Sequence, residues 1–288
     1  MNMRCAETGG RVNWRAEIIS PIYSKENDVR SITTGNEQLL KTATRVLFLI
    51  HGFNNNGEDG ETKLLRWAKN LELDDSWHIV AVLWPGDAKI GFLSYSFEGS
   101  DADDAGEVLA DRIEDLFGEN RSVRICIASH SLGARVALEA ITKLHRRGWP
   151  KIDTLCLLAA AVDSTCLGSD EKYRSAVQSQ IADVGVLYSQ WDTVLAFAYP
   201  AGELLQHFIY FHREESYYPA ALGYYGPENV PLFGIKTPSN VTRSTNTKDL
   251  RGNYKYEHDD YIGYDDPEFI QGNKKINVEF WIKERLGL

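Results

Sequence analysis

The stretch Val123-Arg-Ile-Cys-Ile-Ala-Ser-His-Ser-Leu-Gly-Ala-Arg135 decides how the rest of the chain is interpreted. It contains a short apolar run, then a tight turn of small residues, then the start of a helix. A serine hydroxyl is a weak nucleophile unless it is presented beside a general base. A sharp turn between a strand and a helix presents the hydroxyl in this way. The stretch therefore predicts a nucleophile elbow with Ser131 at its tip.

The residues that flank the turn favour the same structure. The turn needs small residues two positions before and after the serine, and Ser129 and Gly133 occupy these positions. Ser129 departs from the more usual glycine. On the pentapeptide alone, an ordinary turn with a capping serine is the alternative. Apolar residues suit a buried strand before the turn and recur at helical spacing after it. They are Val123, Ile125, Cys126 and Ile127 on one side and Val136, Ala137, Ala140, Ile141 and Leu144 on the other.

The composition limits the class of protein. A chain of 288 residues with 43% apolar and 11% aromatic content can fill a sizeable core. No repeat or low-complexity linker divides it, so we expect one domain over residues 1–288. The formal net charge of −10 argues against nucleic acid as a partner, because phosphate binding needs clustered Lys and Arg. The four cysteines fit neither a disulfide scaffold nor a metal site, and Cys126 and Cys156 lie inside apolar runs as buried thiols would.

The sequence gives no sign of a membrane segment or a cofactor. The N-terminus lacks an apolar signal core, and no apolar run approaches the ~20 residues of a membrane helix. We therefore expect a cytoplasmic protein without integral membrane association. The acidic residues Asp101, Asp103 and Asp104 are expected at the start of a helix, where the helix dipole favours them over a metal site. No metal and no cofactor are predicted.

Apolar runs alternate with amphipathic stretches along most of the chain. This alternation predicts βαβ units, and hence an α/β protein with a largely parallel sheet. Besides the elbow strand, strands are expected at 45–50, 78–84, 154–162, 184–188 and 241–249, and helices at 61–71, 101–117, 170–180 and 276–285.

Two regions interrupt this rhythm. Residues 1–44 are polar and mixed, with an alternation that favours edge strands. Residues 195–240 are rich in Phe and Tyr and precede the last expected strand. Two interpretations of this aromatic segment stay open: a cap or lid over an apolar pocket, or an irregular segment packed on the core.

Ser131 needs a general base later in the chain. A serine hydrolase pairs the nucleophile with a histidine, and in the relevant fold the histidine comes last in the sequence. His258 follows the last predicted strand and is the favoured base. His207 and His212, which fall within the aromatic segment, are the alternative bases. Their other interpretation is that they only line a pocket.

The base in turn needs an acid that orients it. Asp163 and Asp192 both end strands after the elbow, and the carboxyl ends of parallel strands meet at one edge of the sheet. Asp192 is favoured because it lies two strands beyond the elbow strand. Asp163 has the alternative role of capping the turn that follows it.

Two backbone N–H groups are expected to form an oxyanion hole. The residue after the nucleophile, Leu132, supplies one, and Phe53 supplies the other from the loop after an early strand. Gly52 lets that loop approach closely, and His51 shapes it and is not the candidate base. The residues assigned to shaping loops or contacting substrate are His51, Gly52, Asn54 and His130.

Taken together, the motifs His51-Gly-Phe-Asn54, Trp84-Pro-Gly86 and Ser129-His-Ser-Leu-Gly133, with Asp192 and His258, resemble the α/β-hydrolase superfamily. More narrowly, they are similar to a poorly characterised bacterial branch with HGF-N, W-P-S/G and H-S-x-G signatures. The resemblance implies an eight-stranded, mostly parallel sheet with helices on both faces. It also implies a metal-independent Ser-Asp-His mechanism through an acyl-enzyme.

These features predict a serine hydrolase that cleaves a small-molecule carboxylic ester, lipid-like or aromatic given the aromatic segment. Two alternatives remain at this stage. One is a non-catalytic binding module on the same fold, because fold does not fix function. The other is an acyltransferase or amidase that uses the same triad. The sequence gives no indication of the oligomeric state.

Overall fold

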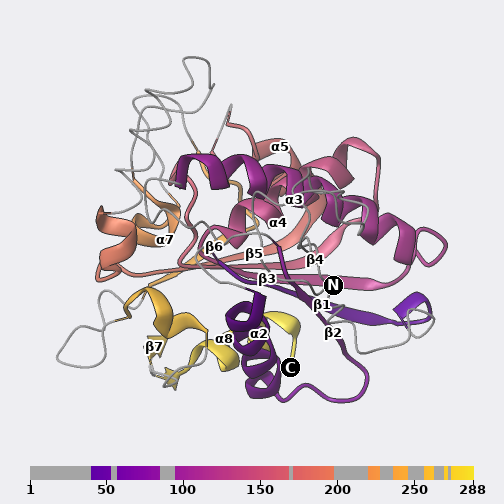
Figure 1. Ribbon diagram of the computed structural model, residues 1–288, viewed down its shortest axis with the longest axis horizontal. Coiled ribbons are helices and arrows are strands. Elements are labelled where there is room, and N and C mark those ends of the chain that lie inside the picture. Colours follow the sequence, from indigo (N-terminus) through magenta and orange to yellow (C-terminus); the bar gives the residue numbers. More distant parts are fainter. Residues whose placement is uncertain are drawn as a thin grey trace.

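The computed structural model describes residues 40–52, 57–84, 95–168, 171–197, 220–227, 236–245, 256–262, 269–271 and 274–288. Within them, six strands form one sheet in the order β2-β1-β3-β4-β5-β6, and every neighbouring pair is parallel (Figure 1). The prediction of an α/β fold with a mostly parallel sheet is confirmed. The strands are β1 Arg45–Ile50, β2 His78–Val82, β3 Arg124–His130, β4 Ile152–Leu158, β5 Ile181–Tyr188 and β6 Val241–Thr245.

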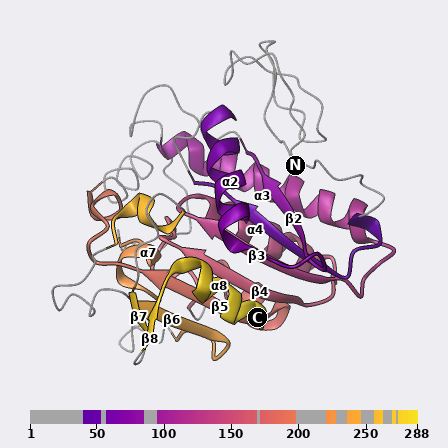
Figure 2. The same ribbon diagram turned by 90° about the horizontal axis from the view of Figure 1, so that it is seen from below.

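Helices cover both faces of this sheet. Figure 1 shows α3, α4 and α5 on one face and α2 and α8 on the other, and the view from below in Figure 2 places α2 and α8 in front of the strands. This arrangement buries both faces of the strands, which explains their continuous apolar runs. The helices are α2 Gly57–Leu71, α3 Tyr95–Phe117, α4 Gly133–Arg146, α5 Arg174–Gln180, α7 Leu222–Tyr225 and α8 Val278–Leu286.

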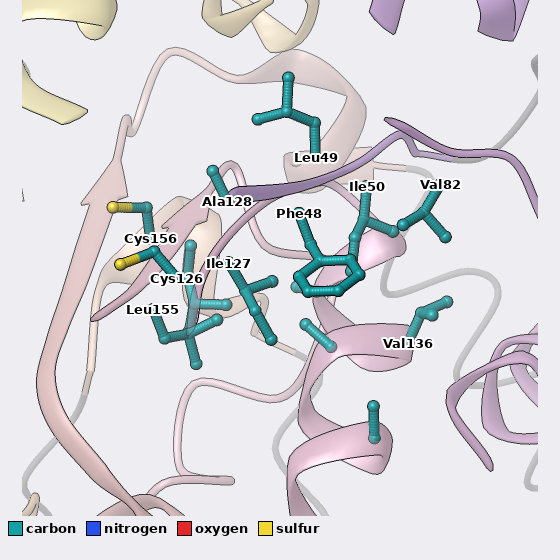
Figure 3. Close-up of a cluster of buried hydrophobic side chains, with 14 of the residues drawn as sticks. Phe48, Leu49, Ile50, Val82, Cys126, Ile127, Ala128, Val136, Leu155 and Cys156 are labelled. Atoms are coloured by element: carbon teal, nitrogen blue, oxygen red, sulfur yellow. The ribbon is translucent and has the colours of Figure 1, made fainter. Parts of the chain in front are cut away.

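The core lies between the central strands and the helices. In β1 every residue after Arg45 is buried, and Phe48 packs edge-to-face on Phe117 of α3 with ring centroids 6.4 Å apart. The cluster in Figure 3 includes the free thiols of Cys126 and Cys156, both buried as expected. Burial raises the pKa of the Cys126 thiol to about 11. These cysteines are therefore packing residues of the sheet and not reactive groups.

Several element boundaries differ from the predictions. The fourth strand of the sheet ends at Leu158 and not at Val162, because the chain turns at Ala159, which has a positive φ of 44°. Helix α3 begins at Tyr95 and not at Asp101. The expectation that Asp103 lies in the first turn of this helix is therefore wrong, and its carboxylate instead pairs with Arg135 of α4.

The C-terminal part contains a small sheet that the sequence did not predict. Strands β7 Phe269–Gln271 and β8 Lys274–Ile276 pair antiparallel, apart from the main sheet. Strands of three residues are too short to show a period. The resemblance implied eight strands in the main sheet, whereas the described residues provide six. The edge strands expected within 1–44 fall almost entirely outside the described residues.

The aromatic segment at 195–240 is described only at 195–197, 220–227 and 236–240. The question of a lid therefore lies outside the described residues. Over the part of the chain that the structure describes, no helix combines the length and the apolar character that crossing a membrane requires. Over the same part, no cluster of His, Cys, Asp and Glu has the arrangement of a metal site.

Candidate active site

Ser131 occupies the turn between β3 and α4 in a strained conformation. Its φ of 54° is in the left-handed region, which is uncommon for a residue other than glycine. The Ser131 N–H donates to the carbonyl of Leu158 at 3.0 Å, and the Ser131 carbonyl accepts from Ala134 and Ala161 at 3.0 and 3.1 Å. These bonds to the end of β4 and to α4 hold a backbone conformation that would otherwise cost about 1–3 kcal/mol.

Close backbone packing explains the small residues around the serine. A Cβ added to Gly133 would lie 2.4 Å from the carbonyl oxygen of His51, and one added to Gly52 would lie 2.6 Å from Cβ of Ser131. The loop after β1 therefore lies directly against the elbow. Ser129 is fully buried, and its hydroxyl donates to the Cys156 carbonyl at 3.4 Å. A serine thus fits where glycine is more usual.

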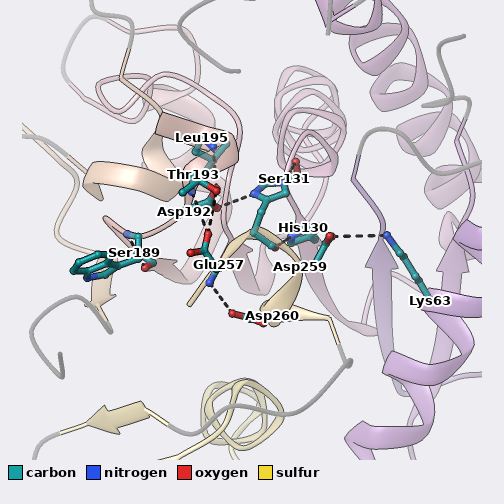
Figure 4. Close-up of polar contacts among 12 residues, drawn as sticks. Lys63, His130, Ser131, Ser189, Asp192, Thr193, Leu195, Glu257, Asp259 and Asp260 are labelled. Atoms are coloured by element: carbon teal, nitrogen blue, oxygen red, sulfur yellow. Dashed lines mark hydrogen bonds and ion pairs between the residues drawn. The ribbon is translucent and has the colours of Figure 1, made fainter. Parts of the chain in front are cut away.

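Three side chains form a continuous chain of hydrogen bonds at the carboxyl edge of the sheet. The Ser131 hydroxyl lies 2.8 Å from Nε2 of His258, and Nδ1 of His258 lies 2.7 Å from a carboxylate oxygen of Asp192 (Figure 4). The carboxylate can only accept, so Nδ1 carries the proton and the Nε2 lone pair faces the serine hydroxyl. This is the geometry in which an imidazole can take a proton from serine.

Asp192 is held on the loop after β5. Its side chain is fully buried, and its second carboxylate oxygen accepts the Leu195 N–H at 2.8 Å. Each oxygen therefore has a donor, which is the condition for burying a carboxylate. The competing candidate, Asp163, makes different contacts. Its Oδ1 accepts the N–H and the hydroxyl of Thr165, each at 2.8 Å. Asp163 thus caps the turn after β4.

His258 begins the short 3₁₀ helix η3, His258–Tyr261. The N-cap residue Glu257 and Asp260 bond reciprocally, with the Glu257 N–H donating to Asp260 Oδ2 at 2.6 Å. The Glu257 carboxylate also accepts the hydroxyl of Thr193 at 3.1 Å, which connects this segment to the loop that carries the aspartate. On its other side, Asp259 pairs with Lys63 of α2 at 3.8 Å (Figure 4).

His51 lies in the loop after β1, where both of its ring nitrogens make hydrogen bonds to the backbone. Its Nδ1–H donates to the Gly52 carbonyl at 2.7 Å, and its Nε2 accepts the Trp84 N–H at 3.2 Å. The indole N–H of Trp84 donates back to the His51 carbonyl at 2.7 Å, and the two rings stack. Both ring nitrogens are engaged, so His51 is not available as a base.

The structure describes only one of the two residues that are expected to supply oxyanion donors. Leu132 is buried and is the N-cap residue of α4, where backbone N–H groups and the helix dipole favour negative charge. Phe53 and Asn54 lie outside the described residues, as do the alternative bases His207 and His212.

The structure also shows contacts that no sequence pattern predicts. His130, expected only to shape a loop or touch substrate, donates from Nε2 to the main-chain carbonyl of His258 at 2.8 Å. Burial and the neighbouring His258 hold the pKa of His130 well below its ordinary value. The contact joins residues 128 positions apart, as the Thr193–Glu257 bond joins residues 64 apart. No local spacing rule reaches that far.

The fold and the arrangement around Ser131 define an α/β-hydrolase. The chain belongs to the family described as "Alpha/beta hydrolase of unknown function (DUF900)", whose model matches residues 30–201. The matched range includes Ser131 and Asp192 and ends before His258. No curated protein sequence matches the chain.

Solved structures with similar folds include several hydrolases. A structure titled "RedJ with PEG molecule bound in the active site" shares 20% identity over 46% of this chain and 48% of its own length, with a TM-score of 0.32, so the chain spans about half of it. An esterase from Pyrobaculum calidifontis shares 16% identity over 77% and 71% of the two chains (TM-score 0.37). YbtT, a type II thioesterase from the yersiniabactin NRPS/PKS biosynthetic pathway, shares 14% over 76% and 88% (TM-score 0.39).

Proposed function

We propose that the protein is a serine hydrolase that cleaves a carboxylic ester through a covalent acyl-enzyme. One observation carries the proposal. Ser131, at positive φ on a strand-to-helix turn, lies 2.8 Å from a histidine nitrogen whose other nitrogen is bonded to a buried carboxylate. Burying an aspartate and straining a serine both cost free energy of folding. Their combination around one imidazole is the arrangement that activates a serine for nucleophilic attack.

In the proposed mechanism each group has one role. As Ser131 Oγ attacks the ester carbon, its proton passes to Nε2 of His258, and Asp192 stabilises the resulting imidazolium. The tetrahedral oxyanion accepts hydrogen bonds from the N–H groups of Leu132 and Phe53. His258 then gives the proton to the leaving alcohol. Water, activated by the same histidine, hydrolyses the acyl-serine and restores the enzyme.

The surroundings support an ester with an apolar part, lipid-like or aromatic. Three apolar side chains on the segment that carries Asp192 are exposed to solvent: Trp191 by 39%, Val194 by 45% and Phe197 by 76%. Exposed apolar groups beside a polar site are typical of ligand-binding surfaces. Transfer of the acyl group to an alcohol or amine would use the same acyl-enzyme, and comparing these acceptors with water separates transfer from hydrolysis.

Labelling with a fluorophosphonate probe tests the proposal. The probe forms a stable bond to an activated serine, so we expect the native protein to be labelled and the Ser131→Ala variant to be unlabelled. Ser164→Ala, which removes another buried serine hydroxyl outside the triad, is the matched control and keeps the labelling. Equal labelling of Ser131→Ala and the native protein would reject Ser131 as the nucleophile. A natively folded protein that binds an ester tightly without being labelled would indicate a binding module.

A further inference from the structure

His130 is the last residue of β3 and immediately precedes the proposed nucleophile. Its side chain is buried, with 3% of the residue exposed. Figure 4 shows His130 beside Ser131, between the loop of Asp192 and the side of the molecule where Lys63 lies. The imidazole of His130 also packs on that of His258, with ring centroids 4.8 Å apart and the planes tilted by 48°. His130 is therefore in direct contact with the proposed base and is not part of the Ser-His-Asp chain.

The hydrogen bond of His130 fixes its protonation. A carbonyl oxygen can only accept, so the 2.8 Å contact with the His258 carbonyl requires a proton on Nε2. The other nitrogen, Nδ1, is buried and has no hydrogen-bond partner among the described residues. Nδ1 lies against the loop after β1, where a Cβ on Gly52 would approach it to 3.1 Å. A proton on Nδ1 would thus find no acceptor among the residues that the structure describes, which favours a neutral His130 of the Nε2–H tautomer.

The charged neighbours favour the same state. Lys63 disfavours a cation at this position, as do His258 and His51 whenever either is protonated, and only the hydrogen bond to the His258 carbonyl acts in the opposite direction. This matters when His258 becomes an imidazolium, because a second cation against its ring would oppose the proton transfer. A neutral donor keeps the hydrogen bond to the His258 backbone throughout the reaction.

We propose that His130 is a positioning residue, which holds the main chain of His258 so that its Nε2 stays within hydrogen-bond reach of Ser131. This inference rests on the proposed function. The ring contacts to Ser131 and Asp192 orient the imidazole but leave its backbone to be placed by other bonds. His130 supplies such a bond from the strand that ends at the nucleophile, so base and nucleophile share one support. A misplacement of about 1 Å in such a site can cost on the order of 10²-fold in rate.

The first test reads the hydrogen bond itself and does not depend on catalysis. Long-range ¹H–¹⁵N NMR spectra of the protein labelled with ¹⁵N-histidine distinguish the two neutral tautomers from the cation. Assignment uses the His130→Gln variant. We expect His130 to remain the neutral Nε2–H form at every pH from 5 to 8 at which the protein is folded. An Nδ1–H tautomer, or titration near pH 6.5, would overturn the inference whatever the enzyme does.

The second test separates positioning from stability. His130→Leu removes the donor, whereas His130→Gln can place an amide N–H near the position of Nε2. With p-nitrophenyl acetate, a small activated ester, we expect His130→Leu to lower kcat about 10- to 100-fold with little change in KM. His130→Gln is expected to recover most of the loss. Both variants are checked by circular dichroism and thermal unfolding, so that rates are compared only between folded proteins.

The outcomes for His130 and for the triad can be told apart. If the native protein is labelled by fluorophosphonate and Ser131→Ala is not, but folded His130→Leu reacts at the native rate, the positioning role is wrong and the hydrolase proposal stands. If the native protein is not labelled while NMR shows the Nε2–H tautomer, the hydrolase proposal fails. The hydrogen bond from His130 to the His258 carbonyl then has no catalytic role. An equal loss of kcat in the Gln and Leu variants would show that a specific donor is not what His130 supplies.

Discussion

At the scale of single residues, the contrast between Asp192 and Asp163 shows how the path of the loop after a strand decides which carboxylate contacts His258. Both aspartates follow strands at the same edge, and the sequence offered either as the acid. Asp192 lies against His258 at 2.7 Å, whereas Asp163 accepts two bonds from Thr165. The difference arises because the loop after β5 passes beside the segment that carries His258, and the turn after β4 folds back on itself.

A pair of isosteric substitutions tests this assignment. In Asp192→Asn the oxygen can still accept from Leu195, but an amide N–H now faces His258 Nδ1 and favours the unproductive tautomer. In a protease triad this change lowers kcat by about 10⁴-fold, and we expect a loss of about 10³-fold or more here. Asp163→Asn is expected to stay within about 10-fold of the native rate, because the Asp163 carboxylate oxygen accepts its two hydrogen bonds from Thr165. Hydrolysis of p-nitrophenyl acetate measures both, and a larger loss in Asp163→Asn would exchange the two roles.

The residues brought together around Ser131 could be named from the sequence because chain order and strand ends are local signals. Ser131 and Asp192 each follow an apolar strand, His258 follows the last expected strand, and the topology of parallel sheets brings the ends of the strands together at one edge. Their catalytic roles remain predictions. The supporting contacts of Glu257 and His130 could not be predicted from local signals, because their partners depend on how segments distant in the sequence pack against one another.

At the scale of elements, the packing of α3 on α4 depends on an ion pair that the sequence concealed. Arg135 reaches Asp103 through two hydrogen bonds of 2.6 and 3.0 Å, and its side chain is only 6% exposed. The sequence predicts Asp103 at a helix start, where the dipole favours an acid, whereas the helix begins eight residues earlier, at Tyr95. The strands were easier to predict, because burial on both faces gives runs of Val, Ile and Leu, and the three-residue strands β7 and β8 give none.

Removing one partner of this ion pair is expected to destabilise the protein. Asp103→Ala leaves the guanidinium of Arg135 buried without its bidentate carboxylate, so we expect the free energy of unfolding to fall by about 2–3 kcal/mol. The control is Glu107→Ala, which breaks the pair with Lys143 from a side chain that is 66% exposed and is expected to cost less than about 1 kcal/mol. Urea unfolding followed by circular dichroism compares them. Equal losses would mean that the Asp103 pair adds no more than a surface pair.

At the scale of the whole molecule, the buried neutral imidazole of His130 couples folding to pH. Its pKa is well below 6.5 in the folded protein, whereas in the unfolded chain it is free to take a proton near that pH. Below about pH 6.5 the unfolded state therefore binds more protons, so stability is present above this pH and declines as the pH falls. One such group contributes at most about 1.4 kcal/mol per pH unit.

The contribution of His130 is isolated by comparing how the free energy of unfolding of two proteins falls as the pH is lowered. Between pH 7 and 5 we expect the free energy of unfolding of the native protein to fall more steeply than that of His130→Leu, which has no proton to gain. Carboxylates that titrate in this range are common to both proteins and cancel in the difference. Urea titrations at intervals of half a pH unit provide the measurement. Parallel slopes would contradict a neutral, buried His130.

The separation of Ser131 and His258 along the chain has a consequence for folding. The two residues are 127 positions apart, and Asp192 lies between them, 66 positions before His258. Contacts between such distant positions carry a large loop-closure entropy, so they form late unless other structure has already drawn the segments together. The half-site made of β3 and α4 is local and can form early. The covalent chemistry that we propose for Ser131 therefore requires the completed topology, and we expect this serine to be inert in a nascent or partly refolded chain.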